Sequence, residues 1–261
     1  MNVWPLASGL FFGYAAGVAA TLPRLERRRR RAALIFSAVG LTLSVVSARL
    51  PFTAVLHDWL LPPALLLLGY WTSGLLFVAP MPRAERVLFA VDRALHIRTI
   101  AAHTPRPLAE FLEFAYVGVY PLIPIALLIQ IWLTDSGDPA VFWTVVLVTD
   151  YICFGVLPWV QTRPPRALEG SAPWSARFRR FNVRLLGTAS INVNTFPSGH
   201  AAEALVAALL VLDAPLPWVV WMFFNALSVS AGAVLGRYHY ALDAFAGWLV
   251  AIVVWLALRG A

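Results

Sequence analysis

Apolar stretches long enough to cross a bilayer recur along this 261-residue chain, separated by short polar segments. A helix of about 20 mostly apolar residues spans the hydrocarbon core of a membrane. Hydrophobic residues make up 60% of the chain, against roughly half in soluble domains. The sequence therefore predicts an all-α, polytopic transmembrane bundle. Its expected spans, about eight, are residues 5–22, 32–48, 59–80, 114–133, 141–160, 199–213, 218–234 and 241–258.

Polar boundaries divide this bundle into two parts. We predict an N-terminal two-span extension at residues 1–50 and a six-span core at residues 51–261. Within the core, residues 83–98 mix charged and apolar side chains between the third and fourth spans. This pattern predicts an amphipathic helix that lies in the membrane interface and guards the lateral entry of lipid. The longest polar stretch, residues 161–197, leads into the sixth span.

Two short motifs place a histidine at the mouth of an apolar span. The first is Phe196-Pro197-Ser198-Gly199-His200, which is typical of a helix start, because serine caps helices and the free N–H groups there bind anions. The second is Arg237-Tyr238-His239-Tyr240-Ala241-Leu242-Asp243. On one helical face, His239 and Asp243 would lie about 5–6 Å apart, so the carboxylate could accept the imidazole N–H.

Together these residues suit phosphoryl transfer, which needs a nucleophile, a proton donor for the leaving oxygen, and positive charge or N–H donors around the phosphate. His239, held in one tautomer by Asp243, could attack phosphorus, and His200 could protonate the leaving group. Ser198, the Gly199 N–H and nearby arginines could hold the phosphate. This chemistry requires neither a metal nor another cofactor, and we expect none.

The ordered motifs resemble those of the type 2 phosphatidic acid phosphatase superfamily of membrane lipid phosphatases and phosphotransferases. Arg163-Pro164 looks like the end of the family's first motif, Pro197-Ser198-Gly199-His200 is the second, and His239 with Asp243 matches the end of the third. The resemblance covers roughly residues 59–258. It implies that His239 forms a phosphohistidine, that Asp243 is its partner, that His200 is the general acid, and that the substrate is a membrane lipid phosphate.

Two positions depart from the family pattern. The family commonly has a lysine seven residues before the first-motif arginine, where this chain has Val156, and an arginine six residues before the third-motif histidine, where it has Ala233. The phosphate would thereby lose two cations. Arg166 and Arg237, beside the motifs, are predicted to replace them.

Within the family, the chain looks closest to the inositol phosphorylceramide synthase branch. The similar features are Arg163-Pro164-Pro165-Arg166, the Gly236–Tyr240 form of the third motif, and Tyr116 and Tyr120 before Pro121. That branch moves a phosphorylated head group to a second lipid instead of to water. A third alternative is a non-enzymatic lipid carrier on the same fold, against which the retained histidines and aspartate argue.

Two acids inside predicted spans stay open between a functional and a structural role. Asp150 lies in the fifth span, and Glu203 follows His200 by one helical turn. Ionisable residues within spans are rare and usually functional, so both are candidates for supporting the site. A zinc site and a serine hydrolase are weaker readings, because the chain has a single cysteine, Cys153, and no Gly-x-Ser-x-Gly setting.

The charge distribution bears on partners and location. The net charge is +7, but the arginines lie between predicted spans, which argues against nucleic-acid binding. We expect an integral protein of a bacterial plasma membrane. With eight spans, eighteen of the twenty arginines fall on the side of the histidine motifs, and the positive-inside rule makes that side cytoplasmic. Enzymes of the resembled family usually act on the outer or luminal face, so the two expectations conflict.

Overall fold

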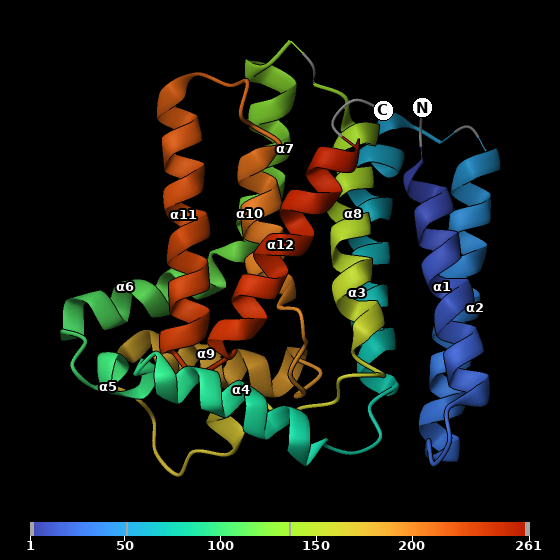
Figure 1. The fold of residues 1–261 in the computed structure, drawn as a ribbon. Coiled ribbons are helices and arrows are strands. Elements are labelled where there is room, and N and C mark those ends of the chain that lie inside the picture. Colours follow the sequence, from blue (N-terminus) through green and yellow to red (C-terminus); the bar gives the residue numbers. More distant parts are fainter. Residues whose placement is uncertain (1–2, 51, 136, 259–261) are drawn as a thin grey trace.

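The computed structural model describes residues 3–50, 52–135 and 137–258, and 75% of the chain is helical. No β-strand occurs in these ranges, which confirms the all-α class. The helices that run side by side in Figure 1 are α1 (Trp4–Thr21), α2 (Arg27–Arg49), α3 (Leu61–Leu75), α7 (Val119–Leu133), α8 (Pro139–Val156), α10 (Gly199–Leu209), α11 (Leu216–Leu235) and α12 (Ala241–Leu258). The helices at one end of this bundle are α4 (Pro82–Ala94), α5 (Ile97–Ala102), α6 (Arg106–Val117) and α9 (Arg177–Ala189). A π-helical turn (Val55–Leu60) precedes α3, and a 3₁₀ turn (Pro165–Ala167) follows α8.

Four helices are long and apolar enough to cross a membrane by themselves, namely α2, α8, α11 and α12. A fifth span is possible if α6 and α7 count as one broken helix. The short helix α10 is apolar and largely buried. Each predicted span coincides with a helix, but a count of eight membrane crossings stays a prediction.

Three local expectations need correction. The fourth predicted span, residues 114–133, is broken at Gly118, where α6 and α7 meet at 63°, so residues 114–117 belong to α6. The amphipathic helix expected at residues 83–98 ends at Ala94, because His96 has a left-handed backbone with φ of 52°. The polar stretch 161–197 contains the helix α9, in which arginines alternate with apolar residues, although no helix was expected there.

The N-terminal pair packs on the side of the bundle away from α11 (Figure 1). Its two helices approach closely at Gly40, where a Cβ atom would clash with the Phe12 ring. Tyr151 of α8 stacks on Phe11 with ring centroids 4.3 Å apart, and its hydroxyl donates to Ser8 Oγ at 3.1 Å. These contacts fix α1 on α8, and α2 packs in turn on α1 and α3.

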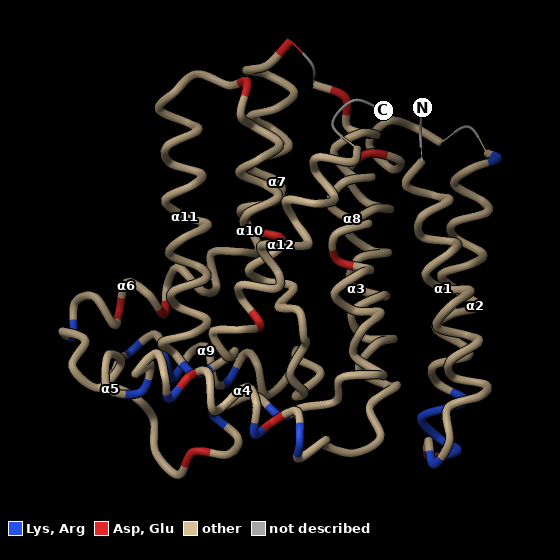
Figure 2. The backbone as a smooth tube through the Cα atoms, viewed as in Figure 1, with Lys and Arg blue, Asp and Glu red and all other residues tan. Residues whose placement is uncertain are grey.

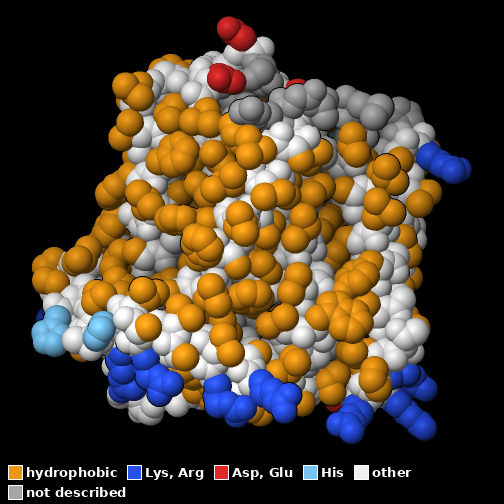
Figure 3. All heavy atoms as spheres, in the orientation of Figure 1, with side chains coloured by type: hydrophobic (Ala, Val, Ile, Leu, Met, Phe, Trp, Pro, Cys, Tyr) orange, Lys and Arg blue, Asp and Glu red, His pale blue; other side chains and the backbone are white. Residues whose placement is uncertain are grey.

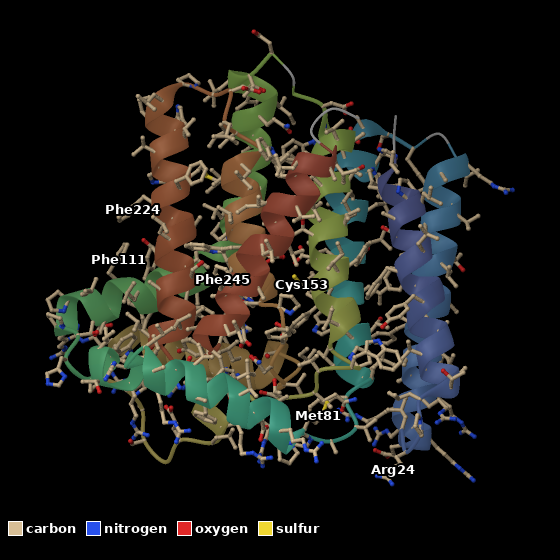
Figure 4. The ribbon with its side chains drawn as sticks, in the orientation of Figure 1. Arg24, Met81, Phe111, Cys153, Phe224 and Phe245 are labelled. Carbon is tan, nitrogen blue, oxygen red and sulfur yellow. The ribbon has the colours of Figure 1, made fainter. Side chains whose placement is uncertain are left out.

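Side-chain chemistry separates the two ends of the bundle. Figure 2 shows most basic positions gathered at the end that carries α4, α5 and α9, together with the α1–α2 turn, where acidic positions lie among them; the loops at the other end carry mainly acidic positions. Between the ends, the visible surface in Figure 3 is mostly hydrophobic. Arg24 and Met81 lie at the basic end in Figure 4, whereas Cys153, labelled on α8, is fully buried. This distribution is compatible with an integral membrane protein.

Candidate active site

The three sequence motifs converge at the basic end of the bundle. Each lies in a loop or at a helix start, and the loops are tied to one another through the backbone. The bonds are Asn194 N–H to Thr162 O (3.0 Å), Arg166 N–H to Arg237 O (3.0 Å) and Ser198 N–H to Asp243 O (2.9 Å). These bonds explain how segments separated by tens of residues hold one arrangement.

The second motif begins α10 as the sequence predicts. Ser198 is the N-cap residue, and its Oγ accepts a hydrogen bond from Ala201 N–H at 3.3 Å. A Cβ atom on Gly247 of α12 would lie 2.5 Å from Ser198 O, so only glycine allows α12 to approach the start of α10 this closely. His200 is therefore positioned by the packing of α12 against the α10 N-terminus.

His239 and Asp243 meet, but not on a helical face as expected. Helix α12 starts at Ala241, and His239 lies in the turn before it. The reason is local capping: Asp243 Oδ2 accepts the Tyr240 N–H at 2.8 Å, the reach-back contact of a capping box. The same Oδ2 lies 3.5 Å from His239 Nδ1. The carboxylate thus caps the helix start and lies beside the imidazole, whose Nδ1 has no hydrogen-bond partner among the described residues.

The two histidines face each other with ring centroids 5.8 Å apart. His200 stacks on Tyr116 at 5.1 Å, and Tyr116 stacks on Tyr238 at 4.2 Å, both nearly parallel. Tyr120 OH lies 3.5 Å from His200 Nε2. Aromatic rings from α6 and from the third motif thus fix the orientation of His200.

Arg166, one of the three predicted phosphate-binding arginines, contacts this stack. Its guanidinium carbon is 5.3 Å from the centre of the Tyr238 ring, a cation–π arrangement. The described residues give its side chain no carboxylate partner within ion-pair distance. Arg166 therefore keeps its positive charge available beside the two histidines.

Arg163 and Arg237 are already paired with carboxylates. Arg163 Nε and Nη2 each donate to Glu85 of α4 at 2.9 Å. Arg237 is 1% exposed and donates to Asp92 at 2.7 Å and to Glu169 at 2.8 Å. These pairs hold α4 and the 3₁₀ turn against the motif loops, and phosphate binding by either arginine stays a prediction.

A cavity of about 190 Å³ adjoins His200. Its walls come from α3, α7, α8, α9 and α10, and they are apolar apart from a few side chains. Gly199, His200 and Glu203 line it from α10. Asp150 lies behind this wall, because its Oδ1 is 3.5 Å from where a Cβ atom on Gly199 would stand. The structure thus brings both predicted intramembrane acids beside the histidine site.

Comparison with known proteins identifies the family of this chain. A family model described as PAP2 superfamily matches residues 86–257, which include every motif above. This chain belongs to the PAP2 superfamily. No curated protein sequence and no solved structure gives a significant match. Members of the PAP2 superfamily are phosphatases, which supports a phosphoric-ester hydrolase role; the synthase-like branch stays a prediction.

One anchor of this PAP2-superfamily site was missed by the sequence analysis. Glu113 of α6 is fully buried and accepts hydrogen bonds from four side chains. The donors are Trp174 Nε1 (2.7 Å), Arg179 Nη1 (2.9 Å), Asn182 Nδ2 (2.7 Å) and Tyr238 OH (2.6 Å). A carboxylate one residue before a predicted span was the available signal. Its partners lie 61–125 residues away, and no local pattern identifies them.

Electrostatics favour a neutral His239 in this PAP2-superfamily protein. Burial, and to a lesser degree the positive charge of Arg166, lower the pKa of His239 to about 3. The imidazole is therefore uncharged at pH 7, and one of its ring nitrogens carries a lone pair. The described residues contain no group of three or more His, Cys, Asp and Glu side chains placed to hold a metal ion.

Proposed function

We propose that this protein is an integral-membrane lipid phosphatase or phosphotransferase that acts through a phosphohistidine on His239. The observation that carries the proposal is the placement of His200 and His239 side by side, with ring centroids 5.8 Å apart, where His200 lines an apolar cavity. Membership in the PAP2 superfamily supports phosphoric-ester chemistry, and the cavity supports a lipid as substrate. Membrane lipids are thus the expected partners.

In the proposed first step, His239 Nε2 attacks phosphorus and the bond to the leaving oxygen breaks. Asp243 faces Nδ1, which leaves Nε2 as the attacking atom. His200 gives its proton to the leaving oxygen, and the lipid alcohol departs. In the second step an acceptor hydroxyl loses its proton to His200 and attacks the phosphohistidine, restoring both histidines. Water as acceptor yields free phosphate.

Charge stabilisation in both steps is assigned to three groups. Arg166 supplies the positive charge, since it has no carboxylate partner in the described part of the chain and lies beside Tyr238. The Gly199 N–H and the Ser198 hydroxyl stand at the α10 N-terminus, where backbone N–H groups and the helix dipole favour an anion. Loss of one such donor typically costs about 10²–10³ in kcat.

The test follows the phosphorus. Purified protein in detergent is supplied with phosphorus-labelled phosphatidic acid, lysophosphatidic acid, a polyprenyl diphosphate and a phosphoinositide, each with and without diacylglycerol or ceramide. We expect turnover in the wild type, none in His200→Ala or His239→Ala, and wild-type rates in His103→Ala, whose side chain is exposed at the end of α5. A phosphorylated protein should accumulate in the wild type and be absent from His239→Ala. Turnover that survives in His239→Ala would refute the phosphohistidine.

Transfer to a second lipid is the alternative that one observation favours. The rim of the cavity includes Leu67, Trp71 and Tyr120, each more than 40% exposed on the surface of α3 or α7, so a lipid alcohol could reach the site from the bilayer. Label that appears only on an added lipid would assign the synthase-like activity. A carrier would bind lipid without moving label and would be insensitive to vanadate, which imitates five-coordinate phosphorus.

We also propose that the site faces the cytoplasm, in line with the charge asymmetry. Eighteen arginines belong to the segments at the basic end, Arg49 ends α2 at the other, and Arg259 lies outside the described residues. Cys153 is buried, so introduced cysteines label against a low background. In intact cells an impermeant maleimide should label Asp135→Cys and spare Ser175→Cys; the reverse result would place the site outside.

A further inference from the structure

The cavity beside His200 contains one strongly polar feature on an otherwise apolar wall. Glu203 lines it, and Asp150 stands behind the same wall with an exposed fraction of 0%. Neither oxygen of Asp150 receives a hydrogen bond from any described group, and no described cation pairs with either acid. Burying a carboxyl group without a hydrogen-bond donor is costly, so Asp150 calls for a polar neighbour that can share a hydrogen bond with it.

The two acids interact with each other. When one proton lies between the two acids, the Asp150 carboxyl group is hydrogen-bonded to the Glu203 carboxyl group. Two carboxyl groups can hydrogen-bond to each other only through a shared proton, because an ionised carboxylate has no donor. That proton is used within the pair. The remaining oxygens can only accept, so a complementary ligand must bring a hydrogen-bond donor.

Distance along α10 fixes where that donor would lie. His200 and Glu203 are three residues apart, which puts their Cβ atoms about 5–6 Å from each other on one face of a helix. Both line the same cavity. With the leaving oxygen of the lipid phosphate at His200, Glu203 is the next polar side chain along α10, about one helical turn away on the wall of the same cavity.

We propose that Glu203, backed by Asp150, is a specificity subsite that accepts a hydrogen bond from a hydroxyl or amide N–H on the carbon next to the phosphorylated carbon. The substrate class is thus a lipid phosphate with a free donor at that carbon, such as a monoacylglycerol phosphate or an N-acylated amino-alcohol phosphate. A polyprenyl phosphate or a fully acylated glycerol phosphate leaves the carboxyl pair unpaired. The inference rests on the proposed function for the position of the phosphate.

The test compares two lipids that differ in one hydroxyl. Monoacylglycerol phosphate and its 2-deoxy analogue are measured for kcat/KM, and their non-hydrolysable phosphonates are measured for Kd. One hydrogen bond to a charged group corresponds to a preference of about 10- to 100-fold for the hydroxylated lipid. In Glu203→Met, which keeps the size and removes the acceptor, the ratio should fall to near one. In Glu203→Gln, whose amide oxygen still accepts, part of the preference should remain.

Leu66→Ala is the matched control, because Leu66 lines the same cavity without a polar group. This variant should change kcat/KM and Kd by the same factor for both lipids, so the ratio between the two lipids stays as in the wild type. The subsite is overturned if the wild-type protein binds the two lipids with nearly equal Kd. It is also overturned if Glu203→Met weakens the binding of both lipids equally. Wild-type protein that shows the Kd preference but turns over neither lipid refutes the proposed catalysis and leaves the subsite standing.

Discussion

Replacing Glu113 by alanine should destabilise the protein more than any single surface change. The carboxylate is fully buried, and Arg179, which donates to it at 2.9 Å, is only 9% exposed. Removing one partner of a buried ion pair costs about 3–5 kcal/mol, because the other charge is left without compensation. The Tyr238 and Trp174 donors lose their acceptor as well. At about 2–4 °C per kcal/mol, the melting temperature in detergent should fall by about 6–20 °C.

The same variant should lose activity at temperatures where it is still folded. Tyr238 is tethered to Glu113 at 2.6 Å and carries the stack that orients His200 through Tyr116. A misplacement of about 1 Å in a catalytic group can cost about 10²-fold in rate. We expect a fall in kcat of that order, measured well below the lowered melting temperature.

Two further variants test whether the Glu113 network stabilises the protein. Tyr238→Phe keeps the stacked ring and removes one hydrogen bond, so its cost should be about 1–3 kcal/mol. Glu26→Gln changes an exposed acid whose side chain makes no capping hydrogen bond to α2. Its free energy of unfolding should therefore stay within about 0.5 kcal/mol of the wild-type value. A Glu113→Ala melting temperature within 2–3 °C of the Glu26→Gln value would show that the buried network does not hold α6 and α9 to the site.

Three further outcomes follow from the site. Arg166→Gln should raise KM for the lipid phosphate. It should also move the acid limb of the kcat/KM profile to higher pH, because losing the nearby positive charge raises the pKa of His239 from about 3 toward its ordinary value; an unmoved limb contradicts this. Arg237→Gln should lower thermal stability while leaving KM within about twofold, since its charge is used by two buried carboxylates; a large KM effect with intact stability would instead assign it to phosphate binding. Gly247→Ala should cost about 1–3 kcal/mol in thermal unfolding, because its Cβ atom would press on Ser198 O; no loss would mean that α12 shifts freely.

Local sequence patterns determined the helices and the reactive motifs. Apolar length predicts a helix wherever the bundle has one, because such a segment must satisfy its backbone internally in a membrane. Ser198 as the cap of α10 was readable from the motif itself, since capping depends on neighbouring residues alone. The superfamily was readable for the same reason, because the motif residues stand at fixed short spacings.

Tertiary structure decided which charges are free. In the sequence Arg163, Arg166 and Arg237 are equivalent candidates for the phosphate, yet two of them meet the carboxylates of Glu85, Asp92 and Glu169 across 68–145 residues of chain. The break at Gly118 and the left-handed His96 were likewise invisible, because apolar periodicity continues through both positions.

The sequence by itself thus determined an all-helical PAP2-superfamily protein and singled out His200, His239 and Asp243 as the candidates for its reactive groups. Only the tertiary structure decided that Asp243 caps its helix while facing His239, that Glu113 ties four donors to the site, and that Glu203 reaches the cavity. The physical reason is the distance along the chain over which each kind of interaction acts. Helix formation and capping are settled within a few residues, whereas the pairing of buried charges depends on which distant segments the packed bundle brings together.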